Sequence, residues 1–64
     1  MTIVDLYKVV PDHIFIRIFR NDSAKMVLTC KVGEIPIRYM DCIIKLMEPA
    51  HGKEIGNCID IVID

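Results

Sequence analysis

The chain has 64 residues, of which 53% are apolar and 27% are charged, with a net charge of −1 at pH 7 and no basic excess. A chain of this length is expected to form one small domain over residues 1–64, and its charge balance disfavours proteins that grip phosphate backbones. No stretch approaches the about eighteen uncharged apolar residues of a membrane span, and no basic region precedes the first apolar run, so we expect an unprocessed, soluble, cytoplasmic protein.

The apolar content is high for such a small domain. A chain of this size buries only about 60% of the surface that its unfolded form exposes. Surplus apolar surface is therefore expected to remain on the folded chain. We expect a homo-oligomer, a dimer or a larger assembly, in which another copy covers that surface.

The first predicted element is a short helix that ends at Pro11. Its apolar residues recur at helical spacing, at Ile3, Leu6, Tyr7 and Val10. Thr2 and Asp5 resemble a capping box at the start of this helix, and proline disfavours helical conformation in the residue before it. The β-branched Val4 and Val9 leave a strand as the alternative.

Two alternating strands are predicted next, over residues 13–20 and 25–32, joined by the turn-forming residues 21–24. The first strand has an isoleucine row and a mixed row of His13, Phe15, Arg17 and Phe19. The second has an apolar row of Met26, Leu28, Cys30 and Val32 and a mixed row of Lys25, Val27, Thr29 and Lys31. Both apolar rows share a face only if the loop has an odd number of residues, most simply three.

The segment after this hairpin supports two interpretations. An amphipathic helix could begin at Pro36 and end before Pro49, with its charged residues on one side. Alternatively, a strand could begin at Cys42, with Ile44 and Leu46 on one face. Methionine and leucine favour the helix, whereas adjacent isoleucines favour the strand.

The end of the chain is predicted to be a strand over residues 57–64. Its isoleucines face one way, and the other row is Cys58, Asp60, Val62 and Asp64. Residues 50–56 contain two glycines and are predicted to form a loop.

The layout of the whole chain resembles small uncharacterised accessory proteins of phages and mobile elements of gut Firmicutes. In that setting, small proteins without active sites often inhibit host defence, as anti-CRISPR proteins do. Their pattern is D-L-hydrophobic, a hairpin, [DE]-I-P, L-[DN]-x-x-V and I-x-I. The matching residues are Asp5, Leu6, Glu34, Ile35, Pro36, Met40, Asp41, Ile44, Ile59 and Ile61. The chain departs from the pattern at residues 21–23, Asn-Asp-Ser, where an Asn-Gly or Asp-Gly turn is usual.

The resemblance implies a division of the disputed segment into a turn or short helix over residues 35–40 and a strand over residues 42–47. The expected fold is therefore α+β, in the order α-β-β-α-β-β, with a four-stranded, mainly antiparallel sheet. The second choice keeps the long helix and has a three-stranded sheet. The resemblance also implies a non-catalytic binding module in the cytoplasm of a host bacterium, plausible as an inhibitor of a defence system such as a CRISPR nuclease.

Catalytic and metal chemistry find little support in the residue spacing. Cys30, Cys42 and Cys58 are too widely spaced for a local zinc chelate, and an odd count without a secretion signal indicates reduced thiols. His13 and His51 are expected to be solvated. We expect no cofactor, no metal ion and no catalytic site.

One candidate binding site remains, the aromatic and basic row of the first predicted strand. Extended by apolar residues of other strands, it predicts an interface of Phe15, Arg17, Phe19, Val27, Lys31, Met47 and Val62. Aromatic residues and arginine dominate protein interfaces, which favours a second copy or a host protein as the partner. The alternative is a small single-strand nucleic-acid or nucleotide binder, in which the rings stack on bases and the cations meet phosphate.

Overall fold

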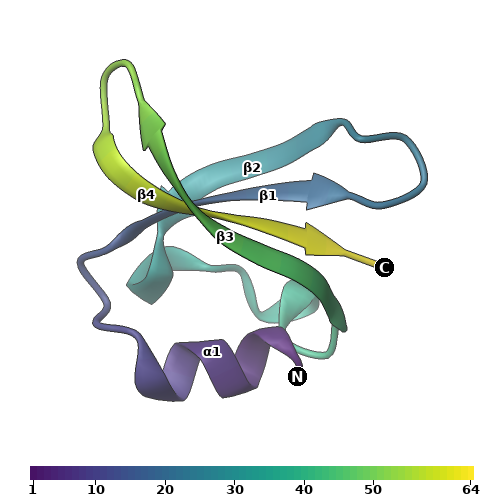
Figure 1. Cartoon of the computed structure of the whole chain (residues 1–64). Coiled ribbons are helices and arrows are strands. Elements are labelled where there is room, and N and C mark those ends of the chain that lie inside the picture. Colours follow the sequence, from purple (N-terminus) through teal and green to yellow (C-terminus); the bar gives the residue numbers. More distant parts are fainter.

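A computed structural model describes all 64 residues, Met1 to Asp64. Its elements are α1 (Ile3–Val9), β1 (Phe15–Arg20), β2 (Met26–Lys31), the 3-10 turns η1 (Val32–Glu34) and η2 (Ile37–Tyr39), β3 (Ile44–Gly52) and β4 (Gly56–Ile63). The four strands form one mixed sheet in the order β2-β1-β4-β3 (Figure 1). The predicted α+β fold with a short N-terminal helix and a four-stranded sheet is confirmed.

The sheet consists of two antiparallel hairpins, β1–β2 and β3–β4, whose inner strands β1 and β4 pair in parallel. The sheet is therefore mainly antiparallel, as predicted, although its central pair is parallel. Ile16 pairs with Ile59 and Ile18 with Ile61. This register places the isoleucine rows of both inner strands on one face.

The hydrophobic core lies between this isoleucine face and α1. Figure 1 shows α1 and the two 3-10 turns on one side of the sheet, with no element covering the other side. The core cluster consists of Ile3, Leu6, Ile16, Ile18, Val32, Ile35, Ile61 and Ile63. None of the helices is long and apolar enough to span a lipid bilayer.

The first turn of α1 is held by the chain segment that precedes β3. The backbone N–H groups of Ile3 and Val4 donate hydrogen bonds to the carbonyl oxygens of Cys42 (3.0 Å) and Met40 (3.1 Å). These N–H groups have no partner within the helix, so a distant segment satisfies them. The helix, which is too short to be stable alone, is therefore anchored by tertiary contacts.

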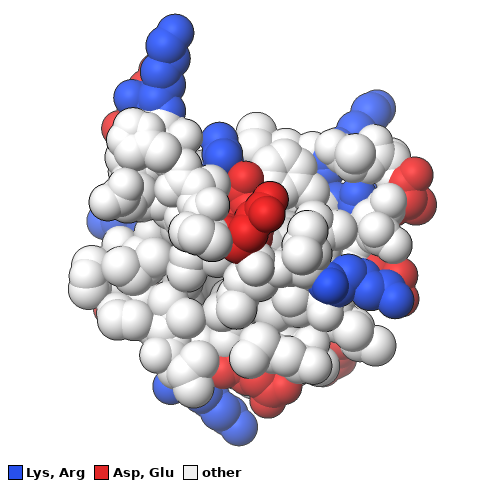
Figure 2. All heavy atoms as spheres, in the orientation of Figure 1, with Lys and Arg blue, Asp and Glu red and all other residues white.

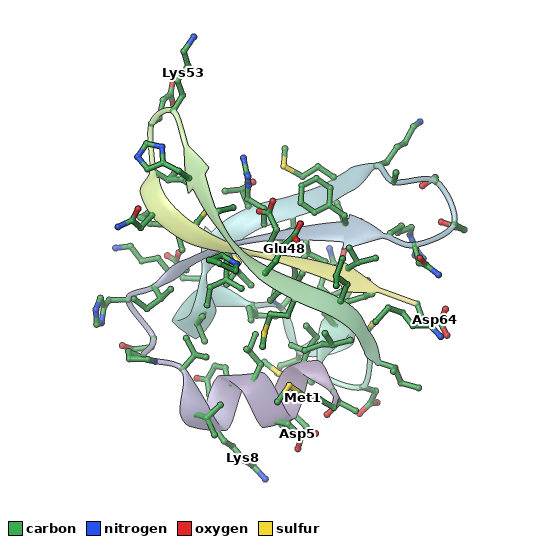
Figure 3. All side chains as sticks on the ribbon, viewed as in Figure 1. Met1, Asp5, Lys8, Glu48, Lys53 and Asp64 are labelled. Carbon is green, nitrogen blue, oxygen red and sulfur yellow. The ribbon has the colours of Figure 1, made fainter.

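The predicted pairing of Thr2 with Asp5 is present at the start of α1, where Asp5 is labelled in Figure 3. The Asp5 carboxylate accepts hydrogen bonds from the Thr2 backbone N–H (2.9 Å) and hydroxyl (3.1 Å). These bonds lower the pKa of Asp5 below its usual value. The carboxylate form is therefore the one that stabilises the helix.

We expect Asp5→Asn to lower the thermal unfolding midpoint at pH 7 and to have little effect near pH 2. A depressed pKa in the folded state contributes stability above the unfolded pKa of about 3.9, and that stability is lost as pH falls through the folded pKa. Circular dichroism melts from pH 2 to pH 7 measure the difference. The matched control is Asp22→Asn in the exposed β1–β2 loop; an equal loss at both pH values for Asp5→Asn would contradict the expectation.

The central pairs of the β1–β2 hairpin have the predicted parity. Ile16 pairs with Cys30 and Ile18 with Leu28, so the two apolar rows share the core face. Residues 21–25 lie between the strands, which is an odd number, but larger than the three residues that were the simplest prediction. The hairpin prediction is therefore confirmed, and the three-residue loop is wrong.

The end of this hairpin departs from strict alternation. The register shifts between Ile18 and Phe19, and Phe19 pairs with Met26. The Thr29 hydroxyl donates to the Met26 Sδ atom at 3.2 Å, so Met26 lies on the face of the phenylalanines and not in the apolar row predicted for it. Val27 instead packs against the core. A β-bulge of this kind adds one residue to one strand and reverses the alternation beyond it.

The disputed segment after the first hairpin divides into 3-10 turns followed by the strand β3, as the preferred division into a turn and a strand predicted. The alternative, a long helix from Pro36 to Pro49, is wrong. The strand begins at Ile44 and continues through Pro49 to Gly52, into the predicted loop. Proline lacks a backbone donor, but β3 lies at the edge of the sheet, where one side of the strand has no partner.

The turn between β3 and β4 is shorter than the predicted loop of residues 50–56. Only residues 53–55 separate the two strands. Gly52 permits this tight return, because a Cβ atom there would lie 2.5 Å from Cγ1 of Ile55. Gly56 adopts a φ of 73°, which glycine tolerates without a steric penalty.

Candidate functional site

The side of the sheet away from α1, which we call the open face, presents twelve side chains in three rows. Each row contains one residue from each strand, in the order β2, β1, β4, β3. The lysine row is Lys31, Phe15, Cys58 and Ala50. The charged row is Thr29, Arg17, Asp60 and Glu48. The apolar row is Met26, Phe19, Val62 and Leu46.

The centre of the open face is an ion pair between neighbouring parallel strands. Arg17 donates two hydrogen bonds to Asp60, from Nε to Oδ1 at 2.7 Å and from Nη2 to Oδ2 at 3.0 Å. These bonds raise the pKa of Arg17. Both side chains are partly buried, with 27% and 20% of their surface exposed. The guanidinium is therefore already engaged by a carboxylate of its own chain, in the bidentate geometry that is typical of strong pairs.

The remaining charges of the open face lie on its two outer strands. Glu48 on β3 is opposite Asp60 and forms no ion pair. Figure 3 shows it projecting from β3 away from α1, and Figure 2 shows acidic atoms in the middle of this view, bordered mainly by uncharged atoms. On β2, the Lys31 ammonium lies 5.6 Å from the centre of the Phe15 ring. The open face thus has one cation outside any ion pair on β2, Lys31, and one anion outside any ion pair on β3, Glu48.

The apolar row crosses all four strands. Its two ends are the most exposed, since Met26 and Leu46 keep 57% and 52% of their surface in solvent. Phe19 and Val62 between them are half-buried. A hollow of about 340 Å³ lies beside Phe19 and Val62, bounded by Glu48 and by the β1–β2 loop. The open face is therefore an apolar strip with a depression next to it.

Five of the seven residues predicted for the interface lie together on the open face: Phe15, Arg17, Phe19, Lys31 and Val62. The other two do not. Val27 packs against the core, and Met47 pairs with Ile61 on the helix side of the sheet. Their placement on the open face was therefore wrong.

The reason for the misplaced Met47 is a second register shift, between Ile44 and Leu46 of β3. Without it, Met47 would lie opposite Asp60 on the open face; with it, Leu46 and Glu48 take the open positions. Sequence reasoning therefore missed Leu46, Glu48 and Met26. It also left Asp60 out of the predicted interface, although the alternation of residues 57–64 places Asp60 on this face. The alternation of apolar and charged residues contains no signal for such a register shift, since apolar and charged residues occur in both alternate rows of β3 near Lys45.

The nucleophilic and metal-ligating residues are dispersed. His13 and His51 are exposed, and the three cysteines are free thiols. Burial, with a smaller effect from the charge of Glu34, raises the pKa of Cys30, so that its thiol stays protonated at neutral pH. No group of three or more histidine, cysteine or acidic side chains is arranged to hold a metal ion.

Comparisons with protein-family models, with curated proteins and with solved structures found no match. The open face is therefore the feature on which a function can be argued.

Proposed function

We propose that this chain is a non-catalytic binding module that works as a homo-oligomer and assembles through the open face. The apolar row carries this proposal, because it crosses all four strands on a side that no element of the chain covers. Contiguous exposed apolar surface on a small domain is typical of an interaction site. For so small a core, association also adds stability.

The composition of the open face supports a protein partner. Phe15, Phe19 and Arg17 are residues of the types enriched at the centres of protein interfaces. Covering Arg17 and Asp60 leaves no isolated charge, since each is already bonded to the other. The central polar residues are therefore compatible with burial under a partner.

The setting we propose is a phage or other mobile element, with the module acting as an inhibitor of a host defence system such as a CRISPR nuclease. This part of the proposal is supported by the resemblance of the chain layout and by the small size of the domain. Pull-down from the host bacterium tests it, and we expect a defence protein to be recovered. If the purified chain then leaves the nuclease activity of the recovered protein unchanged, this part of the proposal is contradicted.

The alternative function, binding of single-stranded nucleic acid or a nucleotide, is less well supported by the geometry. A phosphate group would have to compete with Asp60 for Arg17, and Glu48 adds a negative charge beside them. Lys31 is then the one cation of the open face that is not in an ion pair. Such a face lacks the basic groove that tracks a nucleic-acid backbone.

Sedimentation velocity on the purified chain tests the proposed function. We expect a dimer or larger species at tens of micromolar, the range of a weak specific interface. A strict monomer at these concentrations would contradict the proposal. Fluorescence titration with a single-stranded oligonucleotide at two salt concentrations is expected to show no binding, and binding that weakens with salt would support the alternative instead.

A further inference from the structure

The open face also indicates how the copies of the proposed homo-oligomer are arranged, and this arrangement rests on the proposed function. We propose that a second copy of the chain covers the open face about a twofold axis that runs parallel to the strands. In this dimer β2 of each copy lies over β3 of the other, and β1 lies over β4. The charges of the open face, including those that line the hollow, favour this arrangement over the other aligned packing of two sheets.

Two aligned arrangements bring identical sheets face to face about a twofold axis. An axis parallel to the strands places the β2 edge of one copy over the β3 edge of the other, so each row meets the same row of the second copy. An axis perpendicular to the strands, through the charged row, keeps each strand over itself and exchanges the lysine row with the apolar row. The register of the four strands therefore specifies which residues meet in each case.

The charged row separates the two arrangements. With the parallel axis, Arg17 lies over Asp60 of the second copy, and Glu48 lies over Thr29, whose hydroxyl can donate a hydrogen bond to it. With the perpendicular axis, each of Arg17, Asp60 and Glu48 lies over its own counterpart. Like charges opposed at a dry interface are strongly unfavourable. The parallel axis thus turns two ion pairs into a closed network of four charges.

The hollow beside Phe19 and Val62 is about 340 Å³ in volume, and Asp60 and Glu48 also line it. Either axis places one phenylalanine and one smaller side chain of the second copy over Phe19 and Val62, so filling of the hollow favours neither arrangement. Its acidic lining favours the parallel axis. About that axis Asp60 and Glu48 face Arg17 and Thr29 of the second copy, whereas about the perpendicular axis each carboxylate faces its own counterpart.

The size of the open face indicates a weak dimer. Twelve side chains, each occupying about 4.8 Å between strands and about 6.8 Å along them, cover about 390 Å² per copy. Two copies would therefore bury about 800 Å² before the relief of the side chains is counted, which is below the roughly 1,200–2,000 Å² of stable specific interfaces and in the range of weak, transient ones. Micromolar dissociation is the corresponding expectation.

Thiol cross-linking between two exposed positions tests the arrangement. Met26→Cys is mixed with a longer, tagged chain that carries Leu46→Cys, and a short bismaleimide is added. Within one chain these positions are about 14 Å apart, three strand spacings, so the product that contains both chains reports the contact between copies. The control mixture pairs Met26→Cys with tagged Lys31→Cys, which meet only about the perpendicular axis, and the unsubstituted chain measures background from native cysteines.

We expect the Met26–Leu46 product in at least about tenfold excess over the Met26–Lys31 product, because cross-linking falls steeply with separation. A dominant Met26–Lys31 product overturns the parallel axis. A sedimenting dimer that yields neither product also overturns it, while leaving the proposed homo-oligomer intact. A chain that sediments as a monomer overturns the proposed function itself.

Discussion

Replacement of Leu6 by alanine is expected to lower the free energy of unfolding by about 2–5 kcal/mol. Leu6 is fully buried and, with Ile3, is the contact of α1 with the isoleucine face. A domain this small has a stability of only roughly 3–5 kcal/mol. The substitution should therefore leave a large part of the population unfolded at 25 °C, because the cavity loosens the one helix that covers the core.

The measurement is urea denaturation followed by circular dichroism, at a single low protein concentration so that association does not add to stability. Tyr7→Ala is the matched control, since Tyr7 is the next residue of the same helix and keeps 44% of its surface exposed. We expect a loss below about 1 kcal/mol for that variant, as for most surface changes. Equal losses for both variants would contradict the importance of the Leu6 contact.

Phe19→Ser is expected to dissociate the proposed homo-oligomer while the chain stays folded. Phe19 lies in the apolar row beside the hollow and is not part of the core cluster. Loss of an aromatic residue that packs in an interface costs about 2 kcal/mol or more, which weakens association by about thirtyfold or more. Phe15→Ser is expected to act in the same direction from the lysine row.

Sedimentation velocity and a thermal melt, performed on the same preparations, distinguish dissociation from unfolding. The control is Ile37→Ser, which also replaces an apolar residue by serine but lies in η2, 87% exposed and on the side of α1. That variant should associate like the unsubstituted chain. If Phe19→Ser stays folded and still associates, or if Ile37→Ser dissociates the chain equally, the open face is not the interface. If Phe19→Ser unfolds the chain, the expectation that Phe19 serves association and not folding is wrong.

Most of the fold was predictable from local patterns. The spacing of Ile3 and Leu6, with Pro11 as a stop, predicted α1, and strict alternation predicted β1 and β4 with their isoleucines facing the core. These patterns are reliable because burial of one face is the dominant favourable contribution to folding, and the side-chain period of each element determines which residues can share that face.

The candidate site was predicted less completely, for a specific reason. Five of its residues lie in regular stretches of β1, β2 and β4. Of the other seven, Met26, Leu46, Glu48 and Ala50 depend on two register shifts, one near Met26 and one near Leu46, each of which moves a neighbouring side chain to the opposite face. Thr29, Cys58 and Asp60 lie in regular stretches, and the alternation placed them on this face, but they were not included in the predicted interface. A shift of one residue is determined by how a strand fits its partner, and the partner is distant in the chain.

The amino-acid sequence by itself determined α1, β1, β2 and β4 and their order, the isoleucine face, and the row with Phe15, Arg17 and Phe19, but it left residues 36–49 open between a helix and a strand. Only the tertiary structure decided that β1 pairs with β4 in parallel, which brings Arg17 to Asp60, and that β3 passes through Pro49 at the edge of the sheet. Local preferences act over a few residues, whereas strand order and register follow from contacts among all four strands. The open face and its three rows are a product of those contacts.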